Sequence, residues 1–237
     1  MPNELLVVRH GQATVGGGDY DQLSERGREQ SRRLGAWLAA HYPDGFAHVV
    51  TGGMRRHKQT LEEIGAAYAA EGRALCAPRV HETLNEFDHS AVLAAFRKLH
   101  AGHPAAGAID FDRKTDPRAL FRALRAGLLA WSEGALESEL AEGWGAFSAR
   151  VARGADELGA LPEAETPTLV VTSGGVIAQL ARRALGLTPA ATVSLNLSIR
   201  NSALSEFRPL DDGMAVLSWN TLPHLAARED RALWTHY

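Results

Sequence analysis

The sequence predicts an α/β fold of three layers: a mixed, mostly parallel sheet with helices on both faces and a helical insertion. Short apolar runs alternate along the chain with amphipathic segments of helical length. The run LLVV at residues 5–8 has the uninterrupted apolar character of a strand buried on both faces. No internal repeat and no linker rich in Pro, Gly or Ser divides the chain. We therefore expect a single domain over residues 1–237, with the insertion at about 89–138.

The first third of the chain alternates strands and helices in the order typical of a parallel sheet. The first helix is expected at 23–42, where Ser24 is a plausible N-cap and Glu25 lies in the first turn. FAHVVTG, residues 46–52, reads as a second strand. A second helix follows over 54–72. The apolar faces of the two helices are marked by residues spaced three and four apart: Leu34, Trp37 and Leu38 in the first, and Leu61, Ile64 and Tyr68 in the second.

The alternation breaks over the insertion and then resumes. A short strand near RVHETLNEFDH ends at Glu86, and DPRALFRALRAGLLAW predicts a helix with Pro117 in its first turn. We expect this helix to act as a lid, with Phe121, Trp131 and the leucines between them packing in the core or touching substrate. The expected later elements are a helix over 143–161, a strand at 168–172, a helix over 176–187 capped by Gly186, a strand in SLNLSIRN ending at Arg200, and a hairpin of 203–208 and 214–220 around Asp212-Gly213.

The composition excludes several classes of protein. A formal charge of −3 leaves no basic stripe for nucleic acid. Cys76 stands alone, so neither a disulfide nor a cysteine-based zinc site is expected within the chain. His100 and His103 lack a carboxylate in a ligand pattern, so we expect no metal and no cofactor. No apolar run suits a signal peptide or a membrane span. We therefore expect a cytoplasmic protein that binds neither nucleic acid nor membrane; a homodimer is left open.

Chemistry-bearing residues follow four of the expected strands. In open α/β sheets ligands bind beyond the carboxyl ends of the strands, so these residues should meet in one crevice. Glycine-rich helix starts and arginine forks both suit a phosphoryl group. The residues are Arg9, His10 and Gly11 after the first strand, Arg55 and Arg56 after the second, Glu86 after the third, and Ser173, Gly174 and Gly175 after the fourth.

These residue types suit phosphoryl transfer through an imidazole. A neutral imidazole is nucleophilic, and the neighbouring cations Arg9 and Arg56 should keep His10 unprotonated near neutral pH. The leaving alkoxide needs a proton, which a partly buried Glu86 with a raised pKa can supply. We expect water, activated by the same carboxylate, to hydrolyse the phosphoimidazole.

The same motifs resemble the histidine phosphatase superfamily, the phosphoglycerate mutase-like proteins. The resemblance spans nearly the whole chain in order and is weakest over the insertion. It implies a nucleophilic His10, phosphate-binding Arg9 and Arg56, and Glu86 as proton donor. Arg56 is preferred to Arg55 because the family's arginine stands three residues before Gln-Thr, here Gln59-Thr60. The motifs are VVRHGQA, LSERGREQSRRLG, MRRHKQT, LNE, VVTSGGVI and NTLPHL, and the expected phosphate-binding positions are Gly11, Gln12, Ser173 and Gly174.

Two positions depart from the family pattern. Ser173 stands where the family has a second histidine, and a neutral hydroxyl donor is about half as strong as a charged one. Its hydroxyl could also cap its own helix. Arg200 is the candidate for a replacement cation. The other departure is Gly16, in the GGG at 16–18, where the family's mutases have an asparagine; this glycine run is either a flexible loop or a ligand cradle.

We therefore expect a metal-independent phosphatase that acts on a small phosphorylated substrate through a phosphohistidine on His10. The serine at position 173 is expected to weaken the activity without abolishing it. Two alternatives stay open: a protein that binds phosphorylated ligands with little or no turnover, and a mutase of the phosphoglycerate type.

Overall fold

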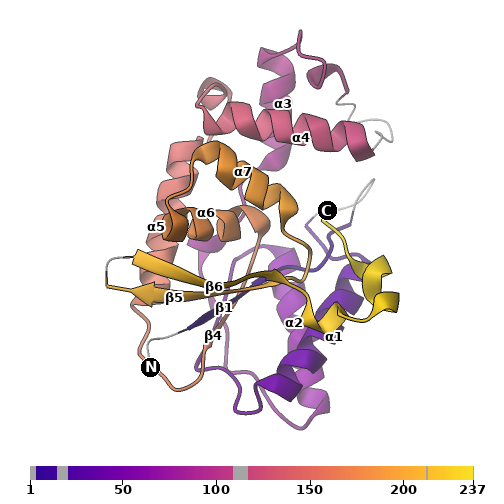
Figure 1. Cartoon of the computed structure of the whole chain (residues 1–237), viewed down its shortest axis with the longest axis vertical. Helices are drawn as coiled ribbons and strands as arrows, with labels where there is room; N and C mark the ends of the chain where they lie inside the picture. Colours follow the sequence, from indigo (N-terminus) through magenta and orange to yellow (C-terminus); the bar gives the residue numbers. More distant parts are fainter. Residues whose placement is uncertain (1–3, 15–20, 109–116, 212, 237) are drawn as a thin grey trace.

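The computed structural model describes residues 4–14, 21–108, 117–211 and 213–236. Its centre is a six-stranded sheet with the order β3-β2-β4-β1-β5-β6 (Figure 1). The first four strands along the chain run parallel, β5 runs antiparallel to its neighbour β1, and β6 runs antiparallel to β5. The sheet is therefore mixed and mostly parallel, as predicted. The strands are β1 Leu5–Arg9, β2 His48–Thr51, β3 Arg79–Val80, β4 Thr168–Thr172, β5 Leu204–Leu210 and β6 Gly213–Thr221.

Helices cover both faces of this sheet (Figure 1). Alternate residues of β1 divide between two cores: Leu6 and Val8 pack with α1 and α2, whereas Leu5 and Val7 face the core formed with α5 and α6. This burial on both sides explains the uninterrupted apolar run. The helices are α1 Glu25–His41, α2 Arg55–Ala70, α3 His89–Leu99, α4 Pro117–Ser132, α5 Trp144–Gly159, α6 Gly174–Leu185 and α7 Pro189–Ser198.

The predicted helix ends agree with the structure where a cap marks them. The Ser24 side chain accepts a hydrogen bond from the Gly27 N–H at the start of α1. Gly186 ends α6 in the left-handed conformation, with φ 63°. The buried face of α2 carries Leu61, Ile64 and Tyr68, as their spacing predicted.

The inserted segment is helical and projects from the sheet as the α3–α4 pair (Figure 1). On α4, Leu128 and Trp131 are buried and Leu120 is exposed. Trp131 packs against Phe87 and Phe147, which attaches the insertion to the core of the sheet. Among the described residues, no helix combines the length and the apolar character needed to cross a bilayer.

Two predicted elements are wrong. The third strand does not end at Glu86: β3 covers only Arg79–Val80, and a 3-10 helix at Glu82–Leu84 leads from it to Glu86. SLNLSIRN was expected to form a strand, but residues up to Ser198 belong to α7. This helix starts at Pro189, and the Thr188 side chain caps it by accepting a hydrogen bond from the Ala191 N–H. The alternating Leu195 and Leu197 give residues 194–201 the apolar pattern of a strand. The N-cap and the proline that mark the start of the helix lie before residue 194. The hairpin of β5 and β6 forms as predicted.

Candidate active site

A cavity of about 70 Å³ opens where β1, β2 and β4 end. Residues from distant parts of the chain line it, including residues of the inserted helix α4 and of the C-terminal segment. Four predicted site residues, Arg9, His10, Arg56 and Glu86, meet here. The other residues that line the cavity are Phe87, His89, Leu124, Leu128, Asn196, Leu197 and His236.

His10 lines the cavity and is only 3% exposed. Its backbone N–H donates to the Thr172 carbonyl, which fixes the residue against the end of β4. Its Nδ1 lies 2.7 Å from the Gly11 carbonyl oxygen. A carbonyl only accepts, so this contact assigns the ring proton to Nδ1 and leaves a lone pair on Nε2. The Arg56 Nε–H donates to that nitrogen over 3.2 Å.

The pKa of His10 lies well below its usual range. Burial is the largest cause, followed by the positive charges of Arg56 and Arg9. The sequence predicted this direction from the two cations alone, and burial adds the larger part. His10 is therefore neutral over the physiological range, in the protonation state of a nucleophile.

The two arginines are held by different partners. The Arg9 guanidinium donates to the Ile199 carbonyl, just beyond α7. Arg56 is 3% exposed and forms an ion pair with Asp21 over 2.8 Å. The other Asp21 oxygen accepts from the Arg55 N–H, so one carboxylate holds both the guanidinium and the start of α2. Arg55 itself is exposed.

Glu86 faces the start of α6. Its Oε2 accepts from the Gly175 N–H over 2.9 Å, and a Cβ at position 175 would lie 2.2 Å from Oε1. Only glycine lets the helix come this close. Burial raises the pKa of Glu86, although the Gly175 and Phe87 N–H groups and the two arginines oppose the shift. The carboxyl thus stays protonated to a higher pH than an exposed one.

Ser173 is fully buried, and its hydroxyl contacts a residue that sequence reasoning missed. It stands at the N-cap position of α6 but makes no capping hydrogen bond with its side chain. Instead its Oγ lies 2.6 Å from His57 Nε2. A signal for His57 was present: residues 57, 61, 64 and 68 share one face of α2, which places His57 on the buried side.

None of the predicted phosphate positions, Gly11, Gln12, Ser173 and Gly174, is among the described residues that line the cavity. The Gly11 N–H donates to Thr60 Oγ1 over 3.0 Å, and the Gln12 N–H donates to Gln30 Oε1 over 2.8 Å. Both amides are thus engaged within the protein. Gly174 lies beside Arg9, because a Cβ there would be 3.5 Å from the arginine Nε.

The cavity also holds polar and apolar residues that the sequence did not indicate. His89 and His236 have lowered pKa values, mainly because of burial. His236 lies in the C-terminal segment, far from any motif. Of the lid residues, Leu124 and Leu128 line the cavity, whereas Phe121 and Trp131 are not in its lining as described.

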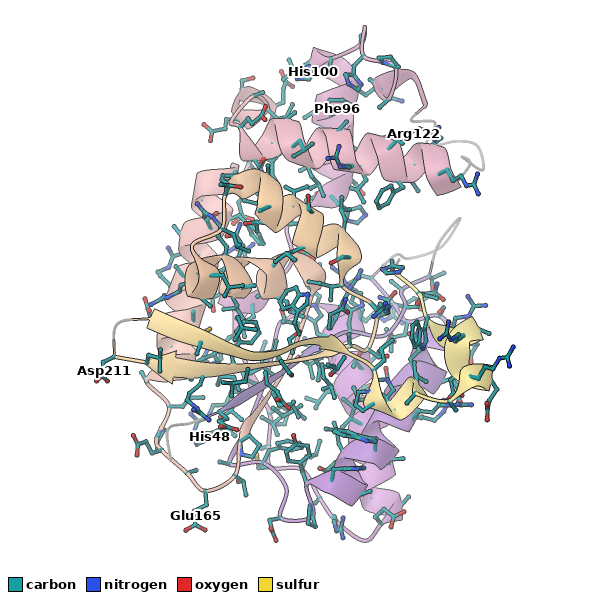
Figure 2. The ribbon with its side chains drawn as sticks, in the orientation of Figure 1. His48, Phe96, His100, Arg122, Glu165 and Asp211 are labelled. Atoms are coloured by element: carbon teal, nitrogen blue, oxygen red, sulfur yellow. The ribbon has the colours of Figure 1, made fainter. Side chains whose placement is uncertain are left out.

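Three further positions that the sequence singled out are Arg200, Gly16 and the pair of His100 and His103. The Arg200 guanidinium lies 4.7 Å from the centre of the Trp234 ring, and Arg200 is not among the described residues lining the cavity. Gly16 and the GGG at 16–18 lie outside the described residues. His100 stacks on Phe96 at the outer part of the insertion (Figure 2). In the described ranges, no cluster of three or more His, Cys, Asp or Glu residues could hold a metal.

The fold and the cavity together define an α/β protein with a phosphoryl-sized, cationic site around a neutral histidine. Comparison with known families agrees: residues 5–222 match the model of the histidine phosphatase superfamily (branch 1). The chain belongs to this superfamily. No curated protein matches the sequence significantly.

Solved structures share the fold at low sequence identity. Phosphoglycerate mutase from Bacillus anthracis has a TM-score of 0.63 and 21% identity, covering 94% of this chain and 96% of its own. The mycobacterial glucosyl-3-phosphoglycerate phosphatase has a TM-score of 0.60 and 23% identity, and the match covers 92% of this chain and 99% of the phosphatase. Phosphoserine phosphatase from Entamoeba histolytica has a TM-score of 0.53 and 14% identity, and the match covers 94% of this chain and 99% of the phosphatase. At these identities the likeness establishes the fold.

Proposed function

We propose that this protein hydrolyses phosphomonoesters without a metal ion, through a phosphohistidine on His10. One observation carries the proposal: the contact between Nδ1 and the Gly11 carbonyl leaves the Nε2 lone pair beside the Arg56 guanidinium in the cavity. A neutral, oriented imidazole next to an oxyanion-binding group has what a phosphoryl acceptor needs.

In the first step, substrate binds with its phosphoryl oxygens against Arg9 and Arg56. The Arg56 Nε–H, which donates to His10 in the free protein, turns to a phosphoryl oxygen and releases the Nε2 lone pair. Nε2 attacks phosphorus, and the bond from phosphorus to the leaving oxygen breaks. Glu86 donates its proton to that oxygen, so the product leaves as an alcohol.

In the second step, water takes the place of the alcohol. The Glu86 carboxylate accepts a proton from the water as its oxygen attacks phosphorus. The N–P bond breaks, and its electron pair returns to Nε2. Inorganic phosphate leaves, and Glu86 is again protonated for the next turnover.

The substrate is expected to be small. Several structures that share the fold act, by their names, on phosphoglycerate, glucosyl-3-phosphoglycerate or phosphoserine. A mutase would differ only in the acceptor of the phosphoryl group. It is the second candidate because a phosphoglycerate mutase shares the fold with a TM-score of 0.63.

The test is hydrolysis of p-nitrophenyl phosphate by the wild type and by His10→Ala, each with and without chelator. We expect turnover that resists chelator and disappears in His10→Ala. The matched control is His48→Ala, at the first residue of β2 and away from the cavity (Figure 2), which should keep the wild-type rate.

Rapid quenching of the reaction should trap an acid-labile phosphoryl group on the wild type and none on His10→Ala. Turnover that survives the loss of His10, or its absence from the wild type, would reject the proposal. Release of inorganic phosphate, rather than transfer to an added phosphoglycerate, separates hydrolase from mutase.

A further inference from the structure

Ser173 and His57 form a buried side-chain contact that the proposed mechanism does not use. Both side chains are fully buried, and their polar atoms are 2.6 Å apart, which is short for a neutral hydrogen bond. Ser173 uses its hydroxyl here and not to cap α6. The pair is therefore a specific interaction between the end of β4 and the first turn of α2.

This pair lies next to the proposed nucleophile. The His57 and His10 ring centres are 5.7 Å apart, with the planes tilted by 40°. Ser173 follows Thr172, whose carbonyl accepts the His10 N–H, and precedes Gly174, which abuts Arg9. The residues on either side of Ser173 therefore lie against His10 and Arg9.

The His57 ring occupies space that the backbone provides. A Cβ at Gly52, just after β2, would lie 2.3 Å from His57 Nδ1. No larger residue at position 52 could coexist with this imidazole without a shift of one of them. Residues 52, 57 and 173 therefore form one packed unit next to the His10 ring.

The protonation state of His57 follows from its surroundings. Burial, and then the Arg56 charge, hold the pKa of His57 well below its usual range, and the Gly52 backbone opposes this weakly. The ring is thus neutral and carries one proton. Nδ1 has no partner in hydrogen-bond geometry among the described residues. A proton on Nδ1 would have only the Gly52 backbone as an acceptor, outside hydrogen-bond geometry, so we assign the proton to Nε2, facing Ser173.

We propose that His57 is a positioning residue: its Nε2–H donates to Ser173 Oγ and so aims the serine O–H at a phosphoryl oxygen in the transition state. The pair thereby supplies the donor that the family pattern provides with a histidine at position 173. No bond is made or broken in this step. The proposal rests on the proposed function, and it assigns a role to His57, which lies within the motif MRRHKQT but to which the resemblance gives no role.

The test is a double-mutant cycle of Ser173→Ala and His57→Leu. The readouts are kcat and KM for p-nitrophenyl phosphate and the inhibition constants of vanadate and inorganic phosphate. Each single change should lower kcat by about tenfold to hundredfold, at or below the loss typical for one oxyanion donor. KM should stay within about threefold. Vanadate, which adopts the five-coordinate geometry of the transition state, should lose more affinity than phosphate.

Two features separate a positioning role from a structural one. The double variant should be no slower than the slower single variant, because the two side chains act as one donor. His57→Gln, whose amide N–H can also donate to Ser173, should recover part of the rate, but not when combined with Ser173→Ala.

A buried serine–histidine pair elsewhere serves as the matched control. His224 Nε2 lies 2.9 Å from Ser202 Oγ, and neither residue lines the cavity as described. His224→Gln should lower the melting temperature to a similar extent as His57→Gln and leave kcat unchanged. Near-UV circular dichroism confirms that each variant is folded.

The proposal is overturned if folded His57→Leu keeps the wild-type kcat and vanadate affinity, or if the two losses multiply independently. Failure of the proposed function looks different, because the wild type would then show no turnover that depends on His10. In that case vanadate binding, measured by calorimetry, still decides. A coupled loss in the cycle supports the donor pair, and equal affinity in all variants rejects it.

Discussion

Two titratable groups in the cavity have pKa values that are shifted in opposite directions. Burial lowers the pKa of the His10 imidazole, helped by Arg56 and Arg9, and raises the pKa of the Glu86 carboxyl. Each group is therefore kept neutral, one as a lone-pair donor and the other as an acid. Such a division is typical of sites that run nucleophilic and acid chemistry at one pH.

The pH dependence of kcat/KM should reflect both shifts. The neutral form of His10 is lost as pH falls through its lowered pKa, so the acidic limb should lie below about 6.5. The acid form of Glu86 is lost as pH rises through its raised pKa, so the alkaline limb should lie above the usual carboxyl range. We expect a bell-shaped profile whose alkaline limb disappears in Glu86→Gln. An unchanged alkaline limb in that variant would remove Glu86 from the acid role.

The loss caused by Glu86→Gln should depend on the leaving group. An alkyl phosphate releases a basic alkoxide that needs a proton, so kcat/KM, which reports the first phosphoryl transfer and not the later attack of water, should fall by about 10²–10⁴. p-Nitrophenolate leaves without protonation, so the loss with p-nitrophenyl phosphate should be at least tenfold smaller. Paired assays on the two substrates measure this difference. Glu62→Gln, exposed on α2, is the control and should behave as the wild type with both. Equal losses with both substrates would contradict the proposal.

At the scale of elements, the sequence predicted those parts whose signals are local. The caps at Ser24 and Gly186 and the apolar faces of α1 and α2 could all be read in advance. Residues 194–201 could not, because alternating leucines within a helix resemble a strand when its start is not recognised. Arg9, His10 and Arg56 could be assigned to one site because they lie at or just after the ends of β1 and β2. Glu86 was placed there from an expected strand end, whereas a 3-10 helix after β3 brings it to the cavity.

His57 was missed for a different reason. Its burial is visible from helical spacing, but its contact with Ser173 depends on how the first turn of α2 packs against the end of β4. No local pattern encodes that distance. Cavity residues such as His236 were missed in the same way, because tertiary packing alone brings the C-terminal segment to the site.

Two glycines in helices should respond in opposite ways to replacement by alanine. At Gly175 the new Cβ would lie 2.2 Å from Glu86 Oε1 and 2.8 Å from the Phe87 ring, so we expect a loss of about 1–3 kcal/mol in the free energy of unfolding. The contact of the Gly175 N–H with Glu86 should also be strained, with a fall in kcat.

At Gly65, inside α2, the nearest atom is Leu75 Cδ1 at 3.9 Å. Alanine there should raise the free energy of unfolding by up to about 1 kcal/mol, because it favours the helix more than glycine does. Urea denaturation of the two variants measures both effects. A stabilised Gly175→Ala variant with full activity would show that α6 and Glu86 can separate freely.

At the scale of the whole molecule, the strand order explains why the site forms. β1 lies between β4 and β5, and β2 lies on the other side of β4, so the residues after β1, β2 and β4 meet at one edge. The helical insertion adds Leu124 and Leu128 to the same cavity. The division into one domain, the cytoplasmic location and the question of a homodimer stay predictions.

The stability of the whole chain should fall as pH is lowered from 7.5 to 5. Burial lowers the pKa values of His10, His57 and His224, the last to about 3. The unfolded chain takes up a proton at each near pH 6.5 and the folded chain does not. Each histidine therefore destabilises the fold by up to about 1.4 kcal/mol per pH unit below 6.5. The raised pKa of Glu86 acts in the opposite direction and offsets part of this loss.

Urea denaturation at several pH values measures this dependence. His224→Gln should show a shallower slope than the wild type, because one of the histidines with a lowered pKa is gone. A free energy of unfolding that does not change with pH would mean that these histidines take up protons over the same pH range in the folded protein as in the unfolded chain.

The packing of positions 52, 57 and 173 also restricts how this lineage can change. A histidine at position 173 would meet the His57 ring, since the serine already lies 2.6 Å from it. A larger residue at position 52 would meet the same ring. Substitutions at these three positions are therefore epistatic, and their order matters. His57 has to be replaced by a smaller residue before Ser173 can be replaced by a larger one. A histidine introduced at position 173 while His57 is present would disrupt the packing and be selected against. Replacement of His57 first leaves room for that histidine, so this order is open to evolution.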